Sequence, residues 1–530
     1  MRTHPALTSC CGITVRRALL AASLASVMLP VLASDATQPD YPPIPLEWPL
    51  PYERSAQATP LWARIEAMRL ASAPNPGLAP VTRQVSTCAD DDTTGSLRTI
   101  LEKASDGDTI DLSALSCSRI TLSQGALKID QDDITLLGPG ATALTLDGEG
   151  RDRVLLHPGG GTLTLEGLTL QNGRFEAVDN DIGFGGCVAS ASSLTLRNVV
   201  IRDCVAVGVG AYGGAVLSGF LTMVNSTISG STAFGDHPTN GTAAYGGGAF
   251  SYGVDIVDST ISGNAAIGTH NAPLSHWEIG GGLFIARNGG TIERSTFNDN
   301  FAIRFAGGLT QEGDLVLRNS TISGNSTEQD DGGGLRVRQG TSVLVQNTTI
   351  ARNHAGSFGG GISFIEYALP SNLDSTIVVD NSAAQGAADI DSAMPLPISG
   401  SNNLIVQLGA NVDVPADTLA EDPELRPLAN NGGLTRTHGL MAGSSALDRG
   451  TNPQFLSADQ RGTGFPREFN GTADIGAFEF QGAQIEPIAV PASGRWSAMA
   501  LAALLAVVGA YRRRSSVRRV FQRQGNTEQV

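Results

Sequence analysis

Residues able to carry out acid–base chemistry gather around the glycine triplet at 332–334. Asp330 and Asp331 precede the triplet, Arg336 follows it, and His354 comes one repeat later at roughly the same phase. A glycosidase needs two carboxyl groups about 5–9.5 Å apart across a sugar bond, so these four residues are the catalytic candidates. A solvated turn accounts for two adjacent aspartates before glycines more simply. We therefore favour a protein without catalysis and keep a polysaccharide-cleaving enzyme as the alternative.

A polysaccharide lyase would need calcium-binding carboxylates and a basic residue that removes a proton. Asp179 and Asp181 are the candidate metal ligands, because calcium prefers carboxylate oxygens, but they suit a loop equally well. Lysine is nearly absent, and no basic residue recurs at one phase of the repeat described below. The Asn-x-Asp, Gly-His-Gly and Arg-x-Lys combination of polygalacturonases is also missing. We expect no cofactor, and a bound calcium ion is the alternative.

Aromatic residues in the two longest inserts, 231–245 and 265–279, are the candidate binding residues. They are Phe234, Tyr245 and Trp277. Inserts on one side of a solenoid often form its binding face, and aromatic rings suit stacking on sugars. A plain surface loop is the simpler interpretation of each insert.

A sequence repeat must position all these candidates. The pattern Asn/Asp-Ser-Thr-Ile-Ser-Gly-Asn recurs after clusters of two or three glycines. Its copies start at Asn198, Asn225, Asp258, Arg294, Asn319, Asn347 and Asp374, which are 25 to 36 residues apart. Apolar and polar residues alternate within each unit, as in strands. Units of this length without a helix bury their apolar face only by stacking. The repeat therefore predicts an all-β, right-handed parallel β-helix of the pectin-lyase-like type, with three short strands per coil.

Asparagine recurs at one phase of the repeat, just after the Ile or Phe. The positions are Asn264, Asn300, Asn325, Asn353 and Asn381. Asparagine tolerates the left-handed conformation that a sharp corner requires. Stacked asparagines also form hydrogen-bonded ladders. We expect both properties at these corners.

Further alternating segments, beginning near Ile110, extend the predicted β-helix towards the N-terminus. Residues 95–104 have the pattern of a short amphipathic helix. A terminal cap of this kind protects the open edge of a solenoid from end-to-end association.

The N-terminus has the features of a secretory signal peptide. Arg16 and Arg17 precede an apolar stretch, and Val31-Leu32-Ala33 supplies small residues before a cleavage site. Cys88, Cys117, Cys187 and Cys204 remain after cleavage, and an even number in an exported chain indicates disulfides. Of the three possible pairings we predict the local one, 88–117 and 187–204.

The C-terminal end predicts a membrane segment. Residues 496–511 are apolar, and the arginines after them fit a cytoplasmic stop. Val490, Pro491 and Trp496 lie ahead of this segment in a sequence that resembles the IPTL-type C-terminal sorting signals of Gram-negative bacteria. The resemblance implies recognition by sorting and processing machinery, and a permanent tail anchor is the alternative.

Residues 425–480 differ in character from the repeat. They contain Leu428-Ala429-Asn430-Asn431-Gly432-Gly433-Leu434, then Asp459-Gln460-Arg461-Gly462 and Asp474-Ile475-Gly476-Ala477-Phe478-Glu479. This series resembles the choice-of-anchor Q domain, which follows β-helix repeats on exported bacterial proteins and precedes a C-terminal anchor. The resemblance implies surface attachment and supplies no catalytic residues. We expect the acidic and basic residues here, with His438, to form a salt-bridged cap that closes the solenoid; the alternative is a cation or ligand site.

These features predict a linear order of segments. The order is signal peptide (1–33), Pro/Ala-rich leader (34–85), β-helix with its N-terminal cap (86–424), C-terminal module (425–480), linker and sorting motif (481–495), transmembrane segment (496–511) and basic cytoplasmic tail (512–530).

The net charge of the predicted ectodomain indicates which classes of partner it repels. Of 35 basic and 51 acidic residues, three arginines fall in the signal, and seven arginines and one glutamate fall after residue 494. The remaining 25 basic and 50 acidic residues give the ectodomain a net charge of −25, which repels nucleic acid and acidic polysaccharide. We expect Sec-dependent export, tethering to the inner membrane facing the periplasm, and transfer to the surface or medium after processing. The expected role is structural or adhesive, with polysaccharide or cell-surface glycans as partners.

Overall fold

The computed structural model describes residues 79–178, 181–236, 242–269, 277–338, 340–365 and 368–482. All of them belong to the second of two compact units, Pro49–Val530. The predicted signal peptide, the sorting motif at Val490, Pro491 and Trp496, and the apolar segment 496–511 lie outside the described residues. Within the described ranges, no helix is long and apolar enough to cross a membrane.

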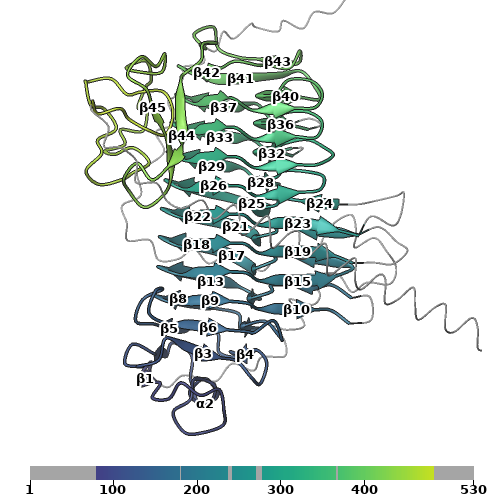
Figure 1. The fold of residues 1–530 in the computed structure, drawn as a ribbon, viewed down its shortest axis with the longest axis vertical. Coiled ribbons are helices and arrows are strands. Elements are labelled where there is room, and N and C mark those ends of the chain that lie inside the picture. Colours follow the sequence, from purple (N-terminus) through teal and green to yellow (C-terminus); the bar gives the residue numbers. More distant parts are fainter. Residues whose placement is uncertain are drawn as a thin grey trace, which may run out of the picture. The chain divides into compact units, whose positions relative to one another are not determined.

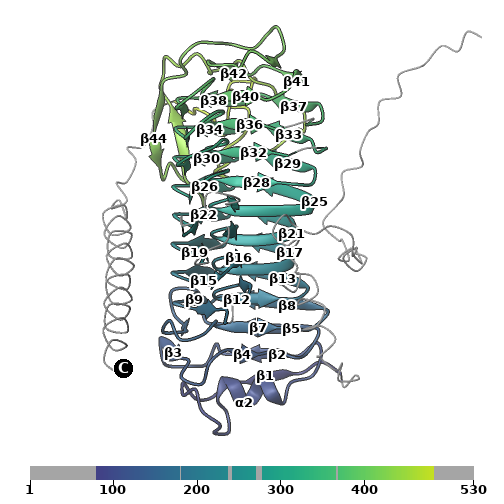
Figure 2. The same ribbon diagram turned by 90° about the vertical axis from the view of Figure 1, so that its right-hand side faces the viewer.

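The described residues form stacked coils of parallel strands (Figures 1 and 2). The coils pass through a twenty-stranded and an eleven-stranded sheet, most of them also add a strand to an eight-stranded sheet, and several add one to a four-stranded sheet. Every pairing between coils is parallel, as in β13 with β17 and β17 with β21. This arrangement is a parallel β-helix, and its fourth sheet was not expected from the three-strand repeat. A right-handed path remains the expectation from the crossover rule.

The strands of the twenty-stranded sheet are β1 (Thr82–Gln84), β2 (Thr109–Asp111), β4 (Leu127–Lys128), β5 (Ile134–Leu137), β7 (Leu155–His157), β8 (Thr162–Glu166), β12 (Val188–Ser190), β13 (Ser193–Arg197), β17 (Val216–Val224), β21 (Ala249–Val257), β25 (Leu283–Glu293), β28 (Leu309–Gln311), β29 (Leu315–Arg318), β32 (Leu335–Val337), β33 (Val343–Gln346), β36 (Ile362–Phe364), β37 (Ser371–Asp374), β40 (Ile390–Ser392), β41 (Leu396–Ser401) and β43 (Val412–Asp413). Those of the eleven-stranded sheet are β3 (Arg119–Thr121), β6 (Thr145–Asp147), β9 (Thr169–Gln171), β14 (Val200–Arg202), β18 (Thr227–Ser229), β22 (Thr260–Ser262), β26 (Thr296–Asn298), β30 (Thr321–Ser323), β34 (Thr349–Ala351), β38 (Ile377–Val379) and β42 (Leu404–Ile405).

The eight-stranded sheet contains β10 (Arg174–Glu176), β15 (Val205–Gly208), β19 (Thr232–Gly235), β23 (Ala265–Gly268), β27 (Phe301–Ala302), β31 (Ser326–Thr327), β35 (His354–Ala355) and β39 (Ser382–Ala383). The four-stranded sheet contains β11 (Gly183–Phe184), β16 (Gly210–Tyr212), β20 (Ala243–Tyr245) and β24 (Trp277–Ile279). Strands β20 and β24 belong to the two long inserts. Alanines from both sheets form one buried cluster, so small side chains let these sheets approach closely.

Stacked aliphatic residues form the core. One row through the twenty-stranded sheet is Met223, Ile256, Ile292, Leu317 and Val345, each in register with the next. All five are fully buried. Burying a side chain of this size stabilises the fold by about 1.5–3 kcal/mol, and no unit could bury its row without its neighbours.

The asparagine ladder forms as predicted. The backbone N and Nδ2 of Asn264 both donate to Oδ1 of Asn300, each at 3.0 Å, and the same paired bonds continue to Asn381. The expected left-handed conformation, however, lies elsewhere. It occurs one residue earlier, at Gly263 (φ 63°) and Asp299 (φ 57°) for example, because each ladder asparagine must turn its side chain into the corner.

Register also corrects the last copy of the repeat. Ser375, not Asp374, occupies the position of Asn347, since Thr349 pairs with Ile377. Asn347 and Ser375 share the left-handed conformation, with φ of 45° and 47°.

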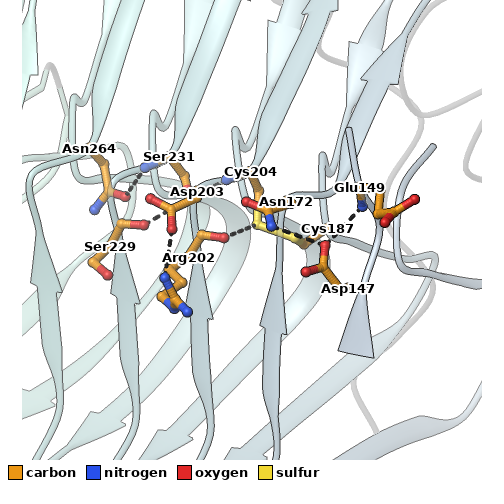
Figure 3. Close-up of a disulfide and its surroundings, with 10 residues drawn as sticks. All are labelled: Asp147, Glu149, Asn172, Cys187, Arg202, Asp203, Cys204, Ser229, Ser231 and Asn264. Carbon is orange, nitrogen blue, oxygen red and sulfur yellow. Dashed lines mark hydrogen bonds and ion pairs between the residues drawn. A yellow bond between two sulfur atoms is a disulfide. The ribbon is translucent and has the colours of Figure 1, made fainter. Parts of the chain in front are cut away.

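Both predicted disulfides are present, and one stands in for a Gly–Asn pair. Cys204, Ser231 and Asn264 hold the same ladder position on three successive coils. The Cys204 backbone N donates to Ser231 Oγ, and the Ser231 N donates to Asn264 Oδ1 (Figure 3). Cys187 occupies the position that Gly248 fills two coils later. A Cβ at Gly248 would lie 2.9 Å from Asn264 Nδ2, so the ladder amide requires glycine there.

Helix α2 (Leu97–Glu102) lies at the N-terminal end of the coils. Ser96 caps it by accepting from the Thr99 N, and Leu97 and Leu101 join the main core cluster. Strand β1 pairs with β2, so the pairing of the coils reaches Thr82, a few residues before the expected boundary at 86.

Residues 425–480, here called the flanking module, lie along the side of the C-terminal coils, beside the eleven-stranded sheet (Figure 1). They include the antiparallel pair β44 (Leu425–Ala429) and β45 (Thr437–Leu440). The predicted cap at the end of the solenoid is therefore a cover over its flank. Nδ2 atoms of repeat asparagines hold it there: Asn319 donates to Ala458 O, and Asn347 to Thr451 O, each at 2.9 Å.

Candidate functional site

One row of side chains in register on the outer face of the twenty-stranded sheet changes from apolar to polar along the stack of coils. In register order it reads Leu217, Phe250, Phe284, Thr310, Arg336, Ser363 and Asp391. Phe250 and Phe284 stack on each other, and Tyr212 and Tyr245 of the four-stranded sheet meet them edge-on. The aromatic half of the row is thus covered, and polar side chains begin at Thr310.

A charged group follows on the same face, here called the arginine cluster: Arg287, Glu312, Asp331, Arg336 and Arg338. Arg338 Nη1 donates to Glu312 Oε1. Burial raises the pKa of Glu312 above its ordinary value, although the three arginines oppose this. A carboxyl with such a pKa is characteristic of functional sites more often than of plain surfaces.

Arg336 is the most enclosed member of the cluster. Its guanidinium lies 4.0 Å from the centre of the Phe305 ring, and its Nε is 3.5 Å from Asp331 Oδ2. Only 5% of the residue is exposed. Burial lowers its pKa from the ordinary value. Its Nη1 is buried without a hydrogen-bond partner.

Two of the four catalytic candidates come together, and two do not. Asp331 contacts Arg336, and its Oδ2 also accepts from Ser363 Oγ at 2.6 Å. Asp330 instead pairs with Arg304, at 2.5 Å.

His354 belongs to the eight-stranded sheet. It is in register with Ser326 rather than with the aspartate turn, and its Nδ1 lies 2.9 Å from Ser382 Oγ. The shared phase expected for His354 and Asp330 fails, because Asp330 lies in the turn after β31, where its backbone O accepts from the Ser357 N of the next coil.

The three aromatic candidates for glycan binding differ in burial. Tyr245 is fully buried and stacks on Tyr212 with 5.0 Å between ring centres, so it is a packing residue. Phe234 is half-buried in β19. Trp277 is half-buried in β24, and its ring lies 6.2 Å from that of Phe305. Trp277 therefore continues the surface that begins at the arginine cluster.

Only one of the two candidate calcium ligands lies within the described residues. Asp179 lies outside the described residues, and Asp181 Oδ1 accepts from the Ile182 N. In the part of the chain that the structure describes, no group of three or more His, Cys, Asp or Glu side chains could hold a metal ion.

Glu312, Arg287 and Phe305 were missed by sequence reasoning. A signal for Glu312 existed: Gly307-Gly308-Leu309-Thr310-Gln311-Glu312 aligns with Gly333-Gly334-Leu335-Arg336-Val337-Arg338. Aligning the glycine pairs places Thr310 beside Arg336 and Glu312 beside Arg338, as the strand register does.

Comparisons with known proteins give a likeness in structure and none in sequence family. No family model and no curated protein matches this chain. Among solved structures, it is similar to the crystal structure of pectate lyase Pel9A. The TM-score is 0.41 and the identity 13%, over 76% of this chain and 97% of that one. The β-helix is established by the strand pairings of this chain itself.

The flanking module uses its buried charges for packing. Arg461 pairs with Asp459 at 2.7 Å and lies between the rings of Phe465 and Phe478. Arg467 is completely buried and pairs with Glu479 at 3.0 Å.

His438 joins the flanking module to the coils. Its Nε2 lies 2.8 Å from Ser323 Oγ, and its Nδ1 lies 2.7 Å from Arg426 O. These contacts support the salt-bridged interpretation of the segment and leave His438 a packing residue.

Proposed function

We propose that this chain is an exported β-helix protein that binds glycans at the cell envelope without cleaving them. The observation that carries the proposal is the contact series Trp277–Phe305–Arg336, which joins two aromatic rings to the arginine cluster. Aromatic rings stack on the apolar faces of sugars, while arginine and carboxylate groups at their edges bond to hydroxyls. Both kinds of group are half-buried or buried, and hence held in place.

The proposed export is supported by features that do not involve the binding surface. Two disulfides are typical of an oxidising compartment, and the signal peptide predicted at 1–33 would deliver the chain there through Sec. The tail at 496–511 would tether it to the inner membrane, facing the periplasm. The resemblance of 425–480 to the choice-of-anchor Q domain, and of the segment with Val490, Pro491 and Trp496 to a sorting signal, supports later transfer to the surface.

Binding is tested with the full-length protein in detergent and a panel of neutral and acidic oligosaccharides, using calorimetry with and without calcium. We expect saturable binding that Trp277→Ala weakens and Phe469→Ala, an exposed aromatic of the flanking module, leaves unchanged. Absence of binding across the panel would contradict the proposal.

Transfer is tested by fractionating cells that produce the chain. Wild-type protein should leave the inner membrane at a size lacking residues 490–530, and Trp496→Ala should remain there at full length. Full-length wild-type protein in the inner membrane would favour the permanent anchor.

A polysaccharide lyase or hydrolase is the second candidate, favoured by Glu312. Its raised pKa, set among Arg338, Arg336 and Arg287, suits a general acid or base. New reducing ends or unsaturated products, lost in Glu312→Gln, would replace the binding proposal with this one.

A further inference from the structure

Arg336 has hydrogen-bonding capacity that the protein leaves unused. A guanidinium has five N–H donors. The Nε of Arg336 has a long contact to Asp331, and its Nη1 is buried without a partner. Burying a polar group without a hydrogen bond is costly, so an acceptor supplied by a ligand would stabilise the Arg336 guanidinium.

Thr310 is a second, independent side chain with unused hydrogen-bonding capacity. It is the register neighbour of Arg336, on the same face of the twenty-stranded sheet. It is fully buried, and its Oγ1 also has no hydrogen-bond partner. Two adjacent side chains on consecutive coils thus present one unused N–H and one unused hydroxyl.

The net charge of the arginine cluster indicates that the acceptor supplied by a ligand would be negatively charged. The arginine cluster contains three arginines against the two carboxylates of Glu312 and Asp331, a surplus of one positive charge. The nearby pair Arg304–Asp330 adds none. This surplus stands within an ectodomain whose net charge is −25, so it is a local exception to the repulsion expected for acidic glycans.

We infer that Arg336 and Thr310 form a subsite for a single negatively charged oxygen group of a bound sugar, a carboxylate in the first instance. The inference rests on the proposed glycan binding and specifies its ligand as an acidic glycan. A planar carboxylate can accept from the guanidinium edge and from a hydroxyl together. Phe305, on which Arg336 stacks, holds the guanidinium in place for that contact.

The test compares one sugar chain with and without its charges. Oligogalacturonate and its fully methyl-esterified form are titrated into the full-length protein, with a sulfated galactan oligosaccharide as a third probe. Because a hydrogen bond to a charged oxygen is stronger than one to a neutral ester oxygen, we expect the acid form to bind at least about tenfold more tightly than the ester. Tight binding of the sulfated probe alone would overturn the carboxylate assignment in favour of a sulfate.

Substitutions test whether Arg336 is the residue that causes the preference for the acid form. Arg336→Met keeps the length of the side chain and removes its charge, so it should abolish the preference for the acid form. Arg336→Lys should retain part of it. Arg318→Met is the matched control, because Arg318 lies on the same sheet and bonds to Gln346 instead; the preference should persist there.

Thr310→Val covers the case in which Arg336→Met does not fold. It replaces a hydroxyl without a partner by a methyl group of similar size, so the melting temperature should hold while acid binding weakens severalfold. Equal binding of acid and ester, or an unchanged preference in folded Arg336→Met or Thr310→Val, would overturn the subsite and leave glycan binding intact. No binding of any probe would overturn both proposals.

Discussion

Asp389 ends the asparagine ladder by accepting from Asn381. Its Oδ1 lies 2.9 Å from Asn381 Nδ2 and 3.3 Å from the Asn381 N, the two donors that a further asparagine would have served. Its Oδ2 accepts from the Gln407 N at 2.9 Å. The carboxylate therefore supplies the acceptor that a ladder asparagine of the following coil would provide, and Cys204 of the disulfide begins the row that Asp389 ends.

We predict that Asp389→Ala lowers the free energy of unfolding by about 1–3 kcal/mol, because it leaves the buried Asn381 amide without its acceptor. Asp389→Asn should cost less, since its amide oxygen can still accept and burial already raises the pKa of Asp389. Chemical denaturation of both variants checks this. Equal losses for alanine and asparagine would show that the acceptor does not matter.

Replacing the disulfide by the pair that later coils use should recover part of its contribution. Cys187→Ser with Cys204→Ser removes a cross-link that closes a loop of 17 residues, with an expected loss of about 3 kcal/mol. Cys187→Gly with Cys204→Asn re-creates the Gly248–Asn264 arrangement and should unfold at a higher temperature than the serine pair. Identical melting temperatures for the two double variants would contradict the equivalence of these positions.

The asparagine contacts to the flanking module should stabilise its attachment. Asn347→Gly keeps the left-handed backbone and removes the bond to Thr451 O, so it should increase amide exchange and proteolysis within 425–480. Asn225→Gly is the control, because Asn225 has the same conformation (φ 47°) and its side chain bonds to Asn198 rather than to the flanking module. Equal protection of 425–480 in both variants would rule out this role.

Two buried groups of the flanking module should give opposite pH dependences. Burial raises the pKa of Glu479 from 4.5 to about 7, so the folded state holds its proton more tightly and stability falls as pH rises through that window. Burial lowers the pKa of His438 from 6.5 to about 4, so stability falls as pH drops from 6.5 towards 4. The two trends oppose each other between about 4.5 and 6.5.

Single variants should separate these trends. His438→Gln should become less stable as pH rises from 4.5 to 7, and Glu479→Gln should become more stable as pH rises from 4 to 6.5. Unfolding measured at half-unit pH steps provides the check. Parallel curves for both variants and the wild type would show that neither group governs the pH response.

Much of the fold followed from the repeat alone. A recurring Ile with strand alternation on each side has one way to bury its apolar row, which is to stack copies, and the Asn phase predicted the ladder. Both disulfides were predicted from local spacing, and the structure confirms them. The left-handed residue was placed one position late, since sequence alone did not show which residue turns and which reaches inwards.

The site depended on the tertiary structure. Coils of 25 to 36 residues do not keep a common phase, so only the strand register shows that Thr310 and Arg336 are neighbours and that His354 lies on another sheet. Tyr245 and Trp277 both lie near the end of a long insert, yet packing buries Tyr245 and leaves Trp277 half-buried beside Phe305. The sequence by itself determined the stacking of coils, because periodic local patterns are enough to specify it. Which side chains meet across the coils was decided only by the folded chain, because insert lengths and the packing of the sheets set those distances.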